Sequence, residues 1–550
     1  MLRITNGRVY DPANQIDGEV RDVCVRDSRI VADVPPEARR IDAQGMVVMP
    51  GGVDMHAHIA GPKVNLARRL MPDDHRTDPH LRRLHPLMRS GSGGSVPSTF
   101  ATGYRYAMLG YTTVMEAAAA PLGARQVIQE LYDTPIIDKG FFSLLGNNVL
   151  LFQLIKEGRQ DAVKQAVAWW LNAVKAYTAK LVNPGGIEMW KAGKPMLTKQ
   201  TELIEGFGIT PIQVIESIAT AVDELGLPHP IHLHCNNLGH SGNYTTTLET
   251  MQALQGRRAH ITHIQFHCYG GKVGGKPTSK ATAIVDYLKA HRETSADVGQ
   301  VMFGNAATMT ADAPLSYMLH QLTGGKAGSK WVNDDIENES GCGIVPFVYQ
   351  DKNYVHALQW GVGLELFLLN DDPWRMVLST DHPNGGSFMN YPRLIKLLMD
   401  RDFRNSQIKS ANQAAMKKTT LLDDLPHEYT LNEIAIITRA GPARLLGLKN
   451  KGHLGVGADA DITLYEQKVD KEAMFSTPRY VIKSGQIIIE DGDFRADHNG
   501  KLLHVAPAYD PQISETIRPF FDEHYTIQFE NYPVGEEYLR EHEVVPTRAA

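Results

Sequence analysis

The middle of the chain alternates short apolar runs with longer stretches in which apolar residues recur at helical spacing. Eight of these runs have the length and composition of buried strands. Such an alternation predicts a parallel α/β sheet, and eight strand–helix units favour a closed (β/α)8 barrel over an open, doubly wound sheet. The predicted strands are residues 53–60, 112–118, 140–148, 177–186, 230–237, 260–267, 294–303 and 375–383.

Both ends of the chain show another pattern, in which apolar and polar residues alternate along short strands separated by turns. Because both ends share it, we expect them to build one small β-sandwich. The predicted domains are residues 1–50 (first part of the sandwich), residues 51–445 (barrel) and residues 446–550 (second part of the sandwich and a C-terminal extension). Two segments rich in glycine, serine, proline and charge, 61–100 and 320–345, are expected to be loops over the barrel.

Composition and charge narrow the class of protein. Of the 550 residues, 43% are hydrophobic and 21% charged, which is typical of a globular chain with a large core. The 56 basic and 62 acidic residues give a net charge of -6, and no basic run stands out, so we expect no nucleic-acid partner. No apolar stretch is long enough to span a membrane. The four scattered cysteines form no CxxC pair, which favours a reducing, cytoplasmic location.

Two histidines end the first predicted barrel strand. His56 and His58 are two positions apart, so in a strand both imidazoles point to the same face. Two neutral imidazoles at this spacing are suitable ligands for a metal such as zinc. Taken alone, the pair is also compatible with two histidines that bond to backbone groups.

Further candidate ligands end the later strands. The fifth strand ends in His232 and His234, of which His234 lies nearer the strand end, and Asp381 ends the eighth strand. The sixth strand carries His263 and His267, and its pattern alone leaves the choice between them open. Barrel enzymes place their chemistry where the carboxyl ends of the strands meet, so these side chains are expected to converge.

Lys180 near the end of the fourth strand is the remaining candidate. A lone lysine is more often a surface or ion-pair residue, and an ammonium group cannot bind a cation. A buried lysine with a lowered pKa can instead react with carbon dioxide to give a carbamate, which can bridge two metals as a carboxylate does. The spacing of the whole set favours this second interpretation.

This set of residues resembles the amidohydrolase superfamily with a dinuclear metal centre and a carboxylated lysine. Within it, the chain resembles the family formed by the A subunits of formylmethanofuran dehydrogenase and of the bacterial formyltransferase/hydrolase complex. The shared strings run from residue 51 to about 460, and include GGVDMHAHIAGPKVN, KLVNPGG, IHLHCNNLGHSGNY, QFHCYGG and STDHPN. The resemblance favours His263 over His267 as the sixth-strand ligand. The loops 187–208 and 252–258 depart from the archaeal protein, which bears on how a substrate tail is held.

The resemblance implies a TIM-like barrel of the metal-dependent amidohydrolase type that hydrolyses the N-formyl group of a formylated furan carrier to formate and a free amine. It also implies two divalent metals, expected to be zinc, N6-carboxylysine at Lys180, and partner subunits in a hetero-oligomeric, formyltransferase-type complex. The implied metal ligands are His56, His58, Lys180, His234, His263 and Asp381.

Polar residues beside the ligand positions are candidates for catalysis and substrate binding, and each is equally compatible with a role in a turn. Asp381 is expected to accept a proton from the attacking water and to pass it to the leaving amine. The other catalytic candidates are His267, His382 and Asn236, and the substrate-binding candidates are Asn237, Thr308, Thr310 and Asp312.

Three alternatives remain at this stage. The archaeal protein condenses formate with methanofuran inside a tungsten or molybdenum enzyme, and the difference lies mainly in a partner. A stand-alone cyclic-amide hydrolase such as a dihydropyrimidinase would share the ligands but not the strings CNNLG and QFHCYGG. A metal-free barrel that only organises a complex is disfavoured, because every expected ligand type is present.

Overall fold

The computed structural model of the protein describes residues 1–77, 94–194, 196–309, 312, 317, 332–335, 338–339, 341–419 and 425–548. Its centre is a set of eight parallel strands, and each strand overlaps one of the eight predicted apolar runs. The strands are β8 (Gly52–Ala57), β9 (Tyr111–Ala119), β10 (Asp138–Leu144), β11 (Thr178–Val182), β12 (Ile231–His234), β13 (Ala259–Ile261), β16 (Thr294–Asp297) and β20 (Met376–Val377).

These strands close into a ring. Each pairs in parallel with the next, from β8 to β20. An isolated parallel bridge between Ala57 and His382 then joins the first strand to the segment after the last. The backbone nitrogen of His58 donates to the carbonyl of His382 at the same place (2.7 Å). The predicted barrel is therefore confirmed against the open sheet.

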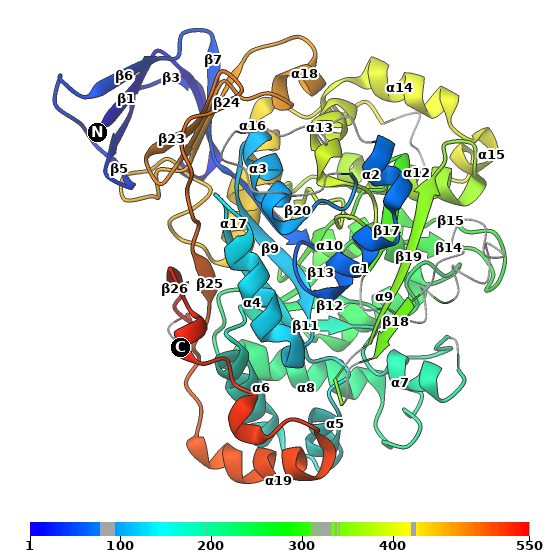
Figure 1. Ribbon diagram of the computed structural model, residues 1–550. Helices are drawn as coiled ribbons and strands as arrows, with labels where there is room; N and C mark the ends of the chain where they lie inside the picture. The colour runs from blue at the N-terminus through cyan, green and yellow to red at the C-terminus, as the bar shows by residue number, and fades with distance from the viewer. Residues whose placement is uncertain are drawn as a thin grey trace.

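Helices surround the ring, as Figure 1 shows. In α8, the Thr210 hydroxyl and the Gln213 side chain cap the first turn reciprocally, and Val214, Ile218 and Val222 recur every fourth residue on the buried face. No helix of the described part of the chain is long and apolar enough to cross a membrane. The helices are α1 (Pro62–Arg69), α2 (Pro72–Thr77), α3 (Thr99–Met108), α4 (Ala124–Asp133), α5 (Val149–Lys156), α6 (Gln160–Val174), α7 (Gly186–Lys191), α8 (Pro211–Glu224), α9 (Tyr244–Ala253), α10 (Ala281–Ala290), α12 (Tyr354–Leu369), α13 (Tyr391–Met399), α14 (Arg401–Ser410), α15 (Gln413–Met416), α16 (Leu431–Ala435), α17 (Gly441–Leu446), α18 (Lys471–Phe475) and α19 (Ser514–His524).

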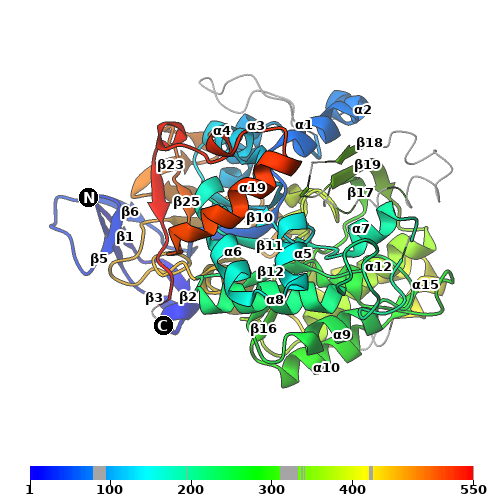
Figure 2. The same ribbon diagram turned by 90° about the horizontal axis from the view of Figure 1, so that it is seen from below.

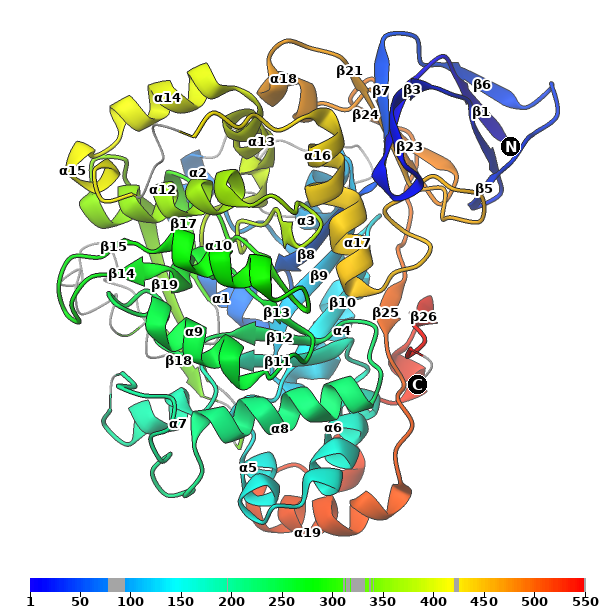
Figure 3. The same cartoon turned by 180° about the vertical axis from the view of Figure 1, so that it is seen from behind.

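Two further sheets lie beside the barrel, next to α16 and α17 in Figure 3. The four-stranded sheet has the order β5 (Arg29–Val31), β4 (Val23–Arg26), β1 (Leu2–Thr5), β6 (Arg39–Asp42). The seven-stranded sheet has the order β24 (Asp493–Phe494), β23 (Gln486–Glu490), β22 (Tyr480–Lys483), β21 (Ile462–Glu466), β7 (Met46–Pro50), β2 (Arg8–Asp11), β3 (Ile16–Val20). Antiparallel pairing of β7 with β21 joins the two ends of the chain, as expected. The domain boundaries themselves stay a prediction.

The last part of the chain leaves these sheets and packs on the barrel. Strands β25 (Leu502–His504) and β26 (His542–Val544) extend the barrel sheet from β10. Helix α19 lies across α6 in Figure 2, and the rings of Trp169 and Phe521 are 5.9 Å apart. The C-terminal extension is therefore held by an aromatic contact with the outer layer of helices.

Two segments expected to be loops contain regular structure. Residues 61–100 include α1, α2 and the start of α3, and residues 320–345 include β18 (Val332–Asp335) and the start of β19 (Gly341–Tyr349). Strand β19 pairs antiparallel with both β17 (Gly304–Thr308) and β18. Glycine and charge hide the two strands in the sequence, because β19 is stabilised by pairing with β17 and β18 by pairing with β19, and not by their own apolar periodicity.

A buried ion cluster links the barrel to the terminal sheets. At the start of β10, the Asp138 carboxylate accepts from Lys483 on β22 (2.5 Å) and from Lys451 (2.5 Å). Asp461 accepts from the same two lysines, at 2.8 and 3.1 Å. Although burial opposes it, the two ammonium groups hold the pKa of Asp138 far below its usual range. Each charge therefore depends on partners in another part of the chain.

Removal of one charge from this cluster should destabilise the fold. Lys483→Met leaves Asp138 and Asp461 buried with half of their countercharge, which should cost about 3–5 kcal/mol of unfolding free energy. Urea denaturation followed by circular dichroism measures this loss, and Lys449→Met, at an exposed position, serves as the control. A Lys483→Met protein that unfolds at the wild-type urea concentration would contradict the structural role of the cluster.

Candidate metal centre

The ring closure brings the first and last strands of the barrel together at the predicted site. His56 and His58 project from the end of β8, and Asp381 follows β20 with a left-handed backbone (φ 50°). The Nε2 atoms of His56 and His58 lie 2.9 and 3.2 Å from Asp381 Oδ1. All three side chains are at most 1% exposed. Three predicted ligands from opposite ends of the barrel segment therefore share one point.

A second group of imidazoles lies beside the first. His234 ends β12, His263 follows β13, and His267 lies one turn later; one ring nitrogen of each lies within 4.8 Å of the others. His263 also forms such a group with His56 and Asp381. The two groups therefore form one continuous set of potential ligands, which we call the histidine cluster. Because both His263 and His267 lie in it, the geometry leaves both available as the sixth-strand ligand.

The histidine cluster is polar, buried and only partly satisfied. Five of its nitrogen and oxygen atoms have neither a hydrogen bond nor an ion pair among the described residues. Each such buried atom costs about 1–3 kcal/mol, so a cation that accepted these lone pairs would remove a large penalty. The residues therefore fit a metal centre. The five atoms are His234 Nδ1, His263 Nδ1, His267 Nδ1 and Nε2, and Asp381 Oδ2.

The protonation states suit metal binding. Burial lowers the pKa of His234, and lowers the pKa values of His263 and His267 still further, so these rings are neutral near pH 7. Neutral imidazole is the form that binds a metal. Burial opposes ionisation of Asp381, yet the neighbouring His56 and His58 hold the pKa of Asp381 well below its usual range. The cluster thus combines three neutral imidazoles with the negative charge of Asp381, whereas, against the effect of burial, Asp297 and Asp381 raise the pKa of His56.

Lys180 lies in the middle of β11 and is 1% exposed. Its Nζ donates to the hydroxyl of Thr262 (3.3 Å). Burial lowers the pKa of Lys180 to about 7, against the opposing charges of Asp381 and Asp297. Near neutral pH a large share of this amine is therefore uncharged, which is the form that reacts with carbon dioxide. The environment suits the predicted carbamate, and the modification itself stays a prediction.

Sequence reasoning missed the carboxylate that holds His56. Asp297 ends β16, and its Oδ2 lies 3.2 Å from His56 Nδ1 and 3.2 Å from His260 Nε2. Its Oδ1 accepts from the backbone nitrogen of His263 (3.0 Å). A carboxylate behind a ligating imidazole sets its tautomer and orientation. The only signal in the sequence is an acidic residue at the end of an otherwise uncharged strand.

Glu116 on β9 has the corresponding place beside His58. Its Oε1 lies 3.4 Å from His58 Nδ1 and accepts from Lys63 Nζ (2.6 Å). Its Oε2 accepts from the backbone nitrogens of Ile59 and Ala60, at 2.6 and 2.9 Å. Burial opposes ionisation, but Lys63 and His58 lower the pKa of Glu116 to about 2. Glu116 therefore fixes the chain that follows His58 as well as the ring itself.

His232 contacts the cluster through the His56 ring nitrogen that does not face Asp381. Its Nε2 is 2.9 Å from His56 Nδ1, and its Nδ1 is 2.9 Å from His229 Nε2. Because both nitrogens already have hydrogen-bond partners, His232 supports His56, although it also forms a group of possible ligands with His56 and Asp297. His234, whose Nδ1 has no partner among the described residues, stays the predicted ligand on this strand.

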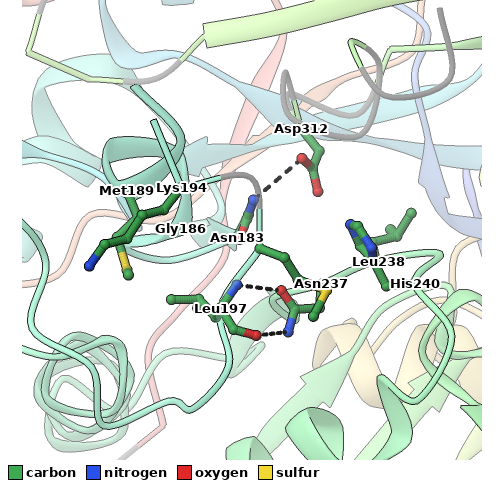
Figure 4. A pocket seen from close by; sticks show the side chains of 10 residues that line it. Asn183, Gly186, Met189, Lys194, Leu197, Asn237, Leu238, His240 and Asp312 are labelled. Carbon is green, nitrogen blue, oxygen red and sulfur yellow. Dashed lines mark hydrogen bonds between the residues drawn. The ribbon is translucent and has the colours of Figure 1, made fainter. Parts of the chain in front are cut away.

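A small hollow, which Figure 4 shows, is lined by Asn183, Asn237 and Asp312 among other residues. Asp312 lies between the hollow and the cluster: its Oδ2 is 3.0 Å from His234 Nε2, and its Oδ1 accepts from Asn183 (3.4 Å). Asn237 holds the backbone of Leu197 by two hydrogen bonds, 3.0 and 2.8 Å long. Asp312 therefore leaves Nδ1 of His234 as the nitrogen that faces the cluster.

The remaining predicted residues lie around the cluster. Asn236 donates to Pro184 (3.2 Å) and Gln200 (2.9 Å), and its Oδ1 has no partner in the described part of the chain. The His382 ring accepts from a backbone nitrogen (3.3 Å), and burial lowers its pKa to about 3. Thr308 is buried in β17, and Thr310 lies outside the described residues. The catalytic and binding roles of these residues stay predictions.

Comparison with known proteins agrees with this geometry. A family model described as "Amidohydrolase family" matches residues 39–489. The chain therefore belongs to the amidohydrolase family, and the resemblance deduced from its sequence is confirmed. Family membership indicates a hydrolase.

Individual relatives of the chain indicate a narrower group within this family. It is 43% identical to "Protein FwdA" of Methanocaldococcus jannaschii over 98% of both chains. It is 38% identical to the A subunit of the formyltransferase/hydrolase complex Fhc of Methylorubrum extorquens, with 97% of this chain and 96% of that protein covered. A crystal structure of the FhcABCD complex from that organism, in complex with methylofuran, contains a chain that is 37% identical, matched over 100% of both chains with a TM-score of 0.93. A dihydropyrimidinase from Brevibacillus agri, 14% identical with a TM-score of 0.50, shows only a shared fold.

Asp297 should control metal affinity through His56. Asp297→Asn keeps the size of the side chain but removes the charge that holds the imidazole, so we expect metal affinity to fall by about 10–100-fold. Competition with a coloured zinc chelator measures the affinity directly, and Asp286→Asn, an exposed position on α10, is the matched control. Unchanged zinc affinity in a folded Asp297→Asn protein would show that Asp297 serves only the backbone of His263.

Proposed function

We propose that the chain hydrolyses the N-formyl group of a formylated furan carrier, using two divalent metals bound in the histidine cluster. The observation that carries the proposal is the convergence of His56, His58, His234, His263 and Asp381 at one rim, with five atoms of the cluster that have no partner among the described residues. The carrier is supported by the whole-length similarity to a chain of a complex that contains methylofuran. The N-formyl bond is a linear amide, in contrast to the ring amide of a dihydropyrimidinase.

The cluster divides into two metal-binding sets. His56, His58 and Asp381 would hold one cation, and His234 through Nδ1 and His263 would hold the other. Carboxylated Lys180 would contribute to both, and His267 is either an additional ligand or a lining residue. Imidazole and carboxylate donors suit zinc. When bound, two such cations polarise the formyl carbonyl and activate a water molecule.

Asp381 would move the proton. Its Oδ1 accepts from Asn384 (2.8 Å), whereas its Oδ2 has no partner among the described residues. The low pKa of Asp381 keeps the carboxylate ionised, so it can take a proton from the attacking water and deliver it to the departing amine. Burial lowers the pKa of His382 to about 3, so its ring is neutral at pH 7. Both remain buried, which excludes bulk water from the transfer.

The chain would work within a hetero-oligomer in the cytoplasm. The support for partner subunits is the near-complete match to one component of a multi-chain complex. The support for a reducing compartment is that Cys24, Cys235 and Cys268 are buried free thiols.

A second candidate function uses the same site in the opposite direction. The chain is more similar to Protein FwdA, at 43% identity, than to the Fhc protein, at 38%. This favours a dehydrogenase-type complex in which formate condenses with methanofuran. The two functions share the metal centre and the formyl amide, and differ in the enzyme that supplies or consumes the formyl group.

Substitution of Lys180 should also remove the metals. Elemental analysis of the purified protein should give about two divalent metals per chain, as a dinuclear site requires. Lys180→Ala should lose most of this metal and its activity, because two cations without the carbamate repel each other. Short carboxylic acids should restore part of both, whereas Lys409→Ala, at an exposed site, should behave as wild type. Full activity of unrescued Lys180→Ala would rule out the carbamate.

Asp381→Asn should separate metal binding from turnover. Asparagine keeps the shape and one oxygen ligand but cannot accept a proton, so we expect near-normal metal content and a rate reduced by about 10²–10⁴-fold. Hydrolysis of the formylated carrier and metal analysis of the same preparation test this. A variant that retains its metals and loses only a few-fold in rate would assign the proton transfer to another group, such as His267 or His382.

The companion chains decide between the two candidate functions. Purification of the native complex, with mass spectrometry of its chains, should identify a formyltransferase-type partner if the chain acts as a hydrolase. Partners that bind molybdopterin and iron–sulfur clusters would establish the dehydrogenase-type role. A chain that runs alone and hydrolyses the free carrier at full rate would contradict both complexes.

A further inference from the structure

A hollow of ≈ 480 Å³ lies at the end of the barrel opposite the histidine cluster. Its lining includes residues that directly precede β12, β13, β16 and β20, so it opens at the amino ends of these strands. We call it the arginine hollow, because five guanidinium groups line it. They belong to Arg258, Arg292, Arg375, Arg444 and Arg548.

The five arginines come from separate parts of the chain. Arg258 and Arg375 immediately precede β13 and β20, and Arg292 lies two residues before β16. Arg444 is on α17, and Arg548 is beyond β26. The backbone nitrogen of Arg548 donates to Gly226 (2.6 Å) and its guanidinium to Pro228 (3.3 Å). These two hydrogen bonds therefore hold Arg548 at the hollow, where it adds the fifth positive charge.

Part of this charge has structural partners. Asp372, one of two acidic residues in the lining, accepts from Arg292 Nη1 (3.1 Å) and Arg375 Nε (2.7 Å). Arg375 Nη1 also donates to three carbonyl oxygens, of Leu288, His291 and Thr294. Arg375 therefore forms the frame of the hollow.

Other guanidinium groups keep unused donors. Arg258 pairs through Nε with Asp223 (3.0 Å), and its buried Nη1 has no partner among the described residues. Burial lowers the pKa of Arg548, and the charge of Arg258 lowers it further. The fold thus keeps two like charges close together beside an unsatisfied donor. The Asp223 carboxylate offsets part of their repulsion, and an anion bound in the hollow would offset more of it.

A second hollow of ≈ 310 Å³ continues the basic surface. Trp374 and Arg444 line both hollows, and the Arg444 guanidinium lies 5.3 Å from the centre of the Trp374 ring. This contact fixes the guanidinium over an aromatic face without using its hydrogen-bond donors. Lys449 and His453 add basic groups on the far side.

We propose that the arginine hollow binds a small molecule that carries two or more phosphate or carboxylate groups. The planar guanidinium group can bind either a phosphate or a carboxylate through two hydrogen bonds. Because the five arginines surround a hollow of ≈ 480 Å³, a ligand that contacts several of them needs more than one anionic group. This site is independent of the hydrolase reaction, because it lies at the amino ends of the strands and shares no residue with the histidine cluster. Its failure would leave the proposed function unaffected.

Isothermal titration of the metal-loaded, full-length protein tests the proposal. Inorganic pyrophosphate and tricarballylate are the two probes, and at low ionic strength we expect at least one to bind with one site per chain and to weaken as salt is added. Tighter binding of pyrophosphate assigns phosphate as the ligand group, and tighter binding of tricarballylate assigns carboxylate. Metal analysis after each titration excludes loss of metal to the probe as the source of the heat.

Two double variants locate the binding. Arg258→Gln/Arg548→Gln removes the repelling pair, and Arg292→Gln/Arg444→Gln removes two exposed groups, so that a folding defect in one is controlled by the other. Each should weaken binding by at least about tenfold, which corresponds to about 1.4 kcal/mol. Arg21→Gln/Arg518→Gln changes the net charge equally at distant surface sites and should bind as wild type. Absence of saturable binding by both probes, full affinity in both hollow variants, or equal loss in the control would overturn the proposal.

Discussion

The structure depends on the ability of the barrel to hold ionisable groups together where water cannot reach them. Five polar atoms without a partner among the described residues share one buried site, and at about 1–3 kcal/mol each they oppose folding by an amount comparable with the whole stability of a domain. Two carboxylates outside the cluster make the arrangement possible. Asp297 and Glu116 each contact a ligating histidine and also accept from backbone nitrogens, so the imidazoles are held from behind while their free nitrogens face one another.

Closure of the ring is the second requirement. His56 and Asp381 are 325 positions apart in the chain, and neither β8 nor β20 contains a signal for the other. They meet because a bridge joins Ala57 to His382, and because the hydroxyl of Ser379 donates to the carbonyl of His56 (3.1 Å). The ligand geometry is thus set by backbone register. A shift of one residue along either strand would turn a ligand to the opposite face.

These facts explain which features sequence reasoning could predict. The eight strands and the histidine spacing are local, so an apolar run or an i, i+2 pair shows them directly, and the joining of both chain ends followed from repeated alternation. Asp297, Glu116 and the contact of Asp312 with His234 depend on which strands become neighbours across the ring, and no local pattern contains that information. Strands β18 and β19 were missed for a related reason: they are stabilised by each other and by β17, and their own composition resembles a loop.

The two ends of the barrel use buried charge in different ways. At the carboxyl ends of the strands, neutral imidazoles and carboxylates are concentrated, so the site attracts cations. At the amino ends, Asp138 is fully matched by Lys451 and Lys483, which joins the terminal sheets to the barrel. The arginine hollow lies at the same end but is only partly matched, since its five guanidinium groups are set against two acidic residues in the lining and Asp223, which pairs with Arg258. A purely structural role would favour the balance seen around Asp138. The excess of positive charge therefore points to a ligand that supplies the missing anions.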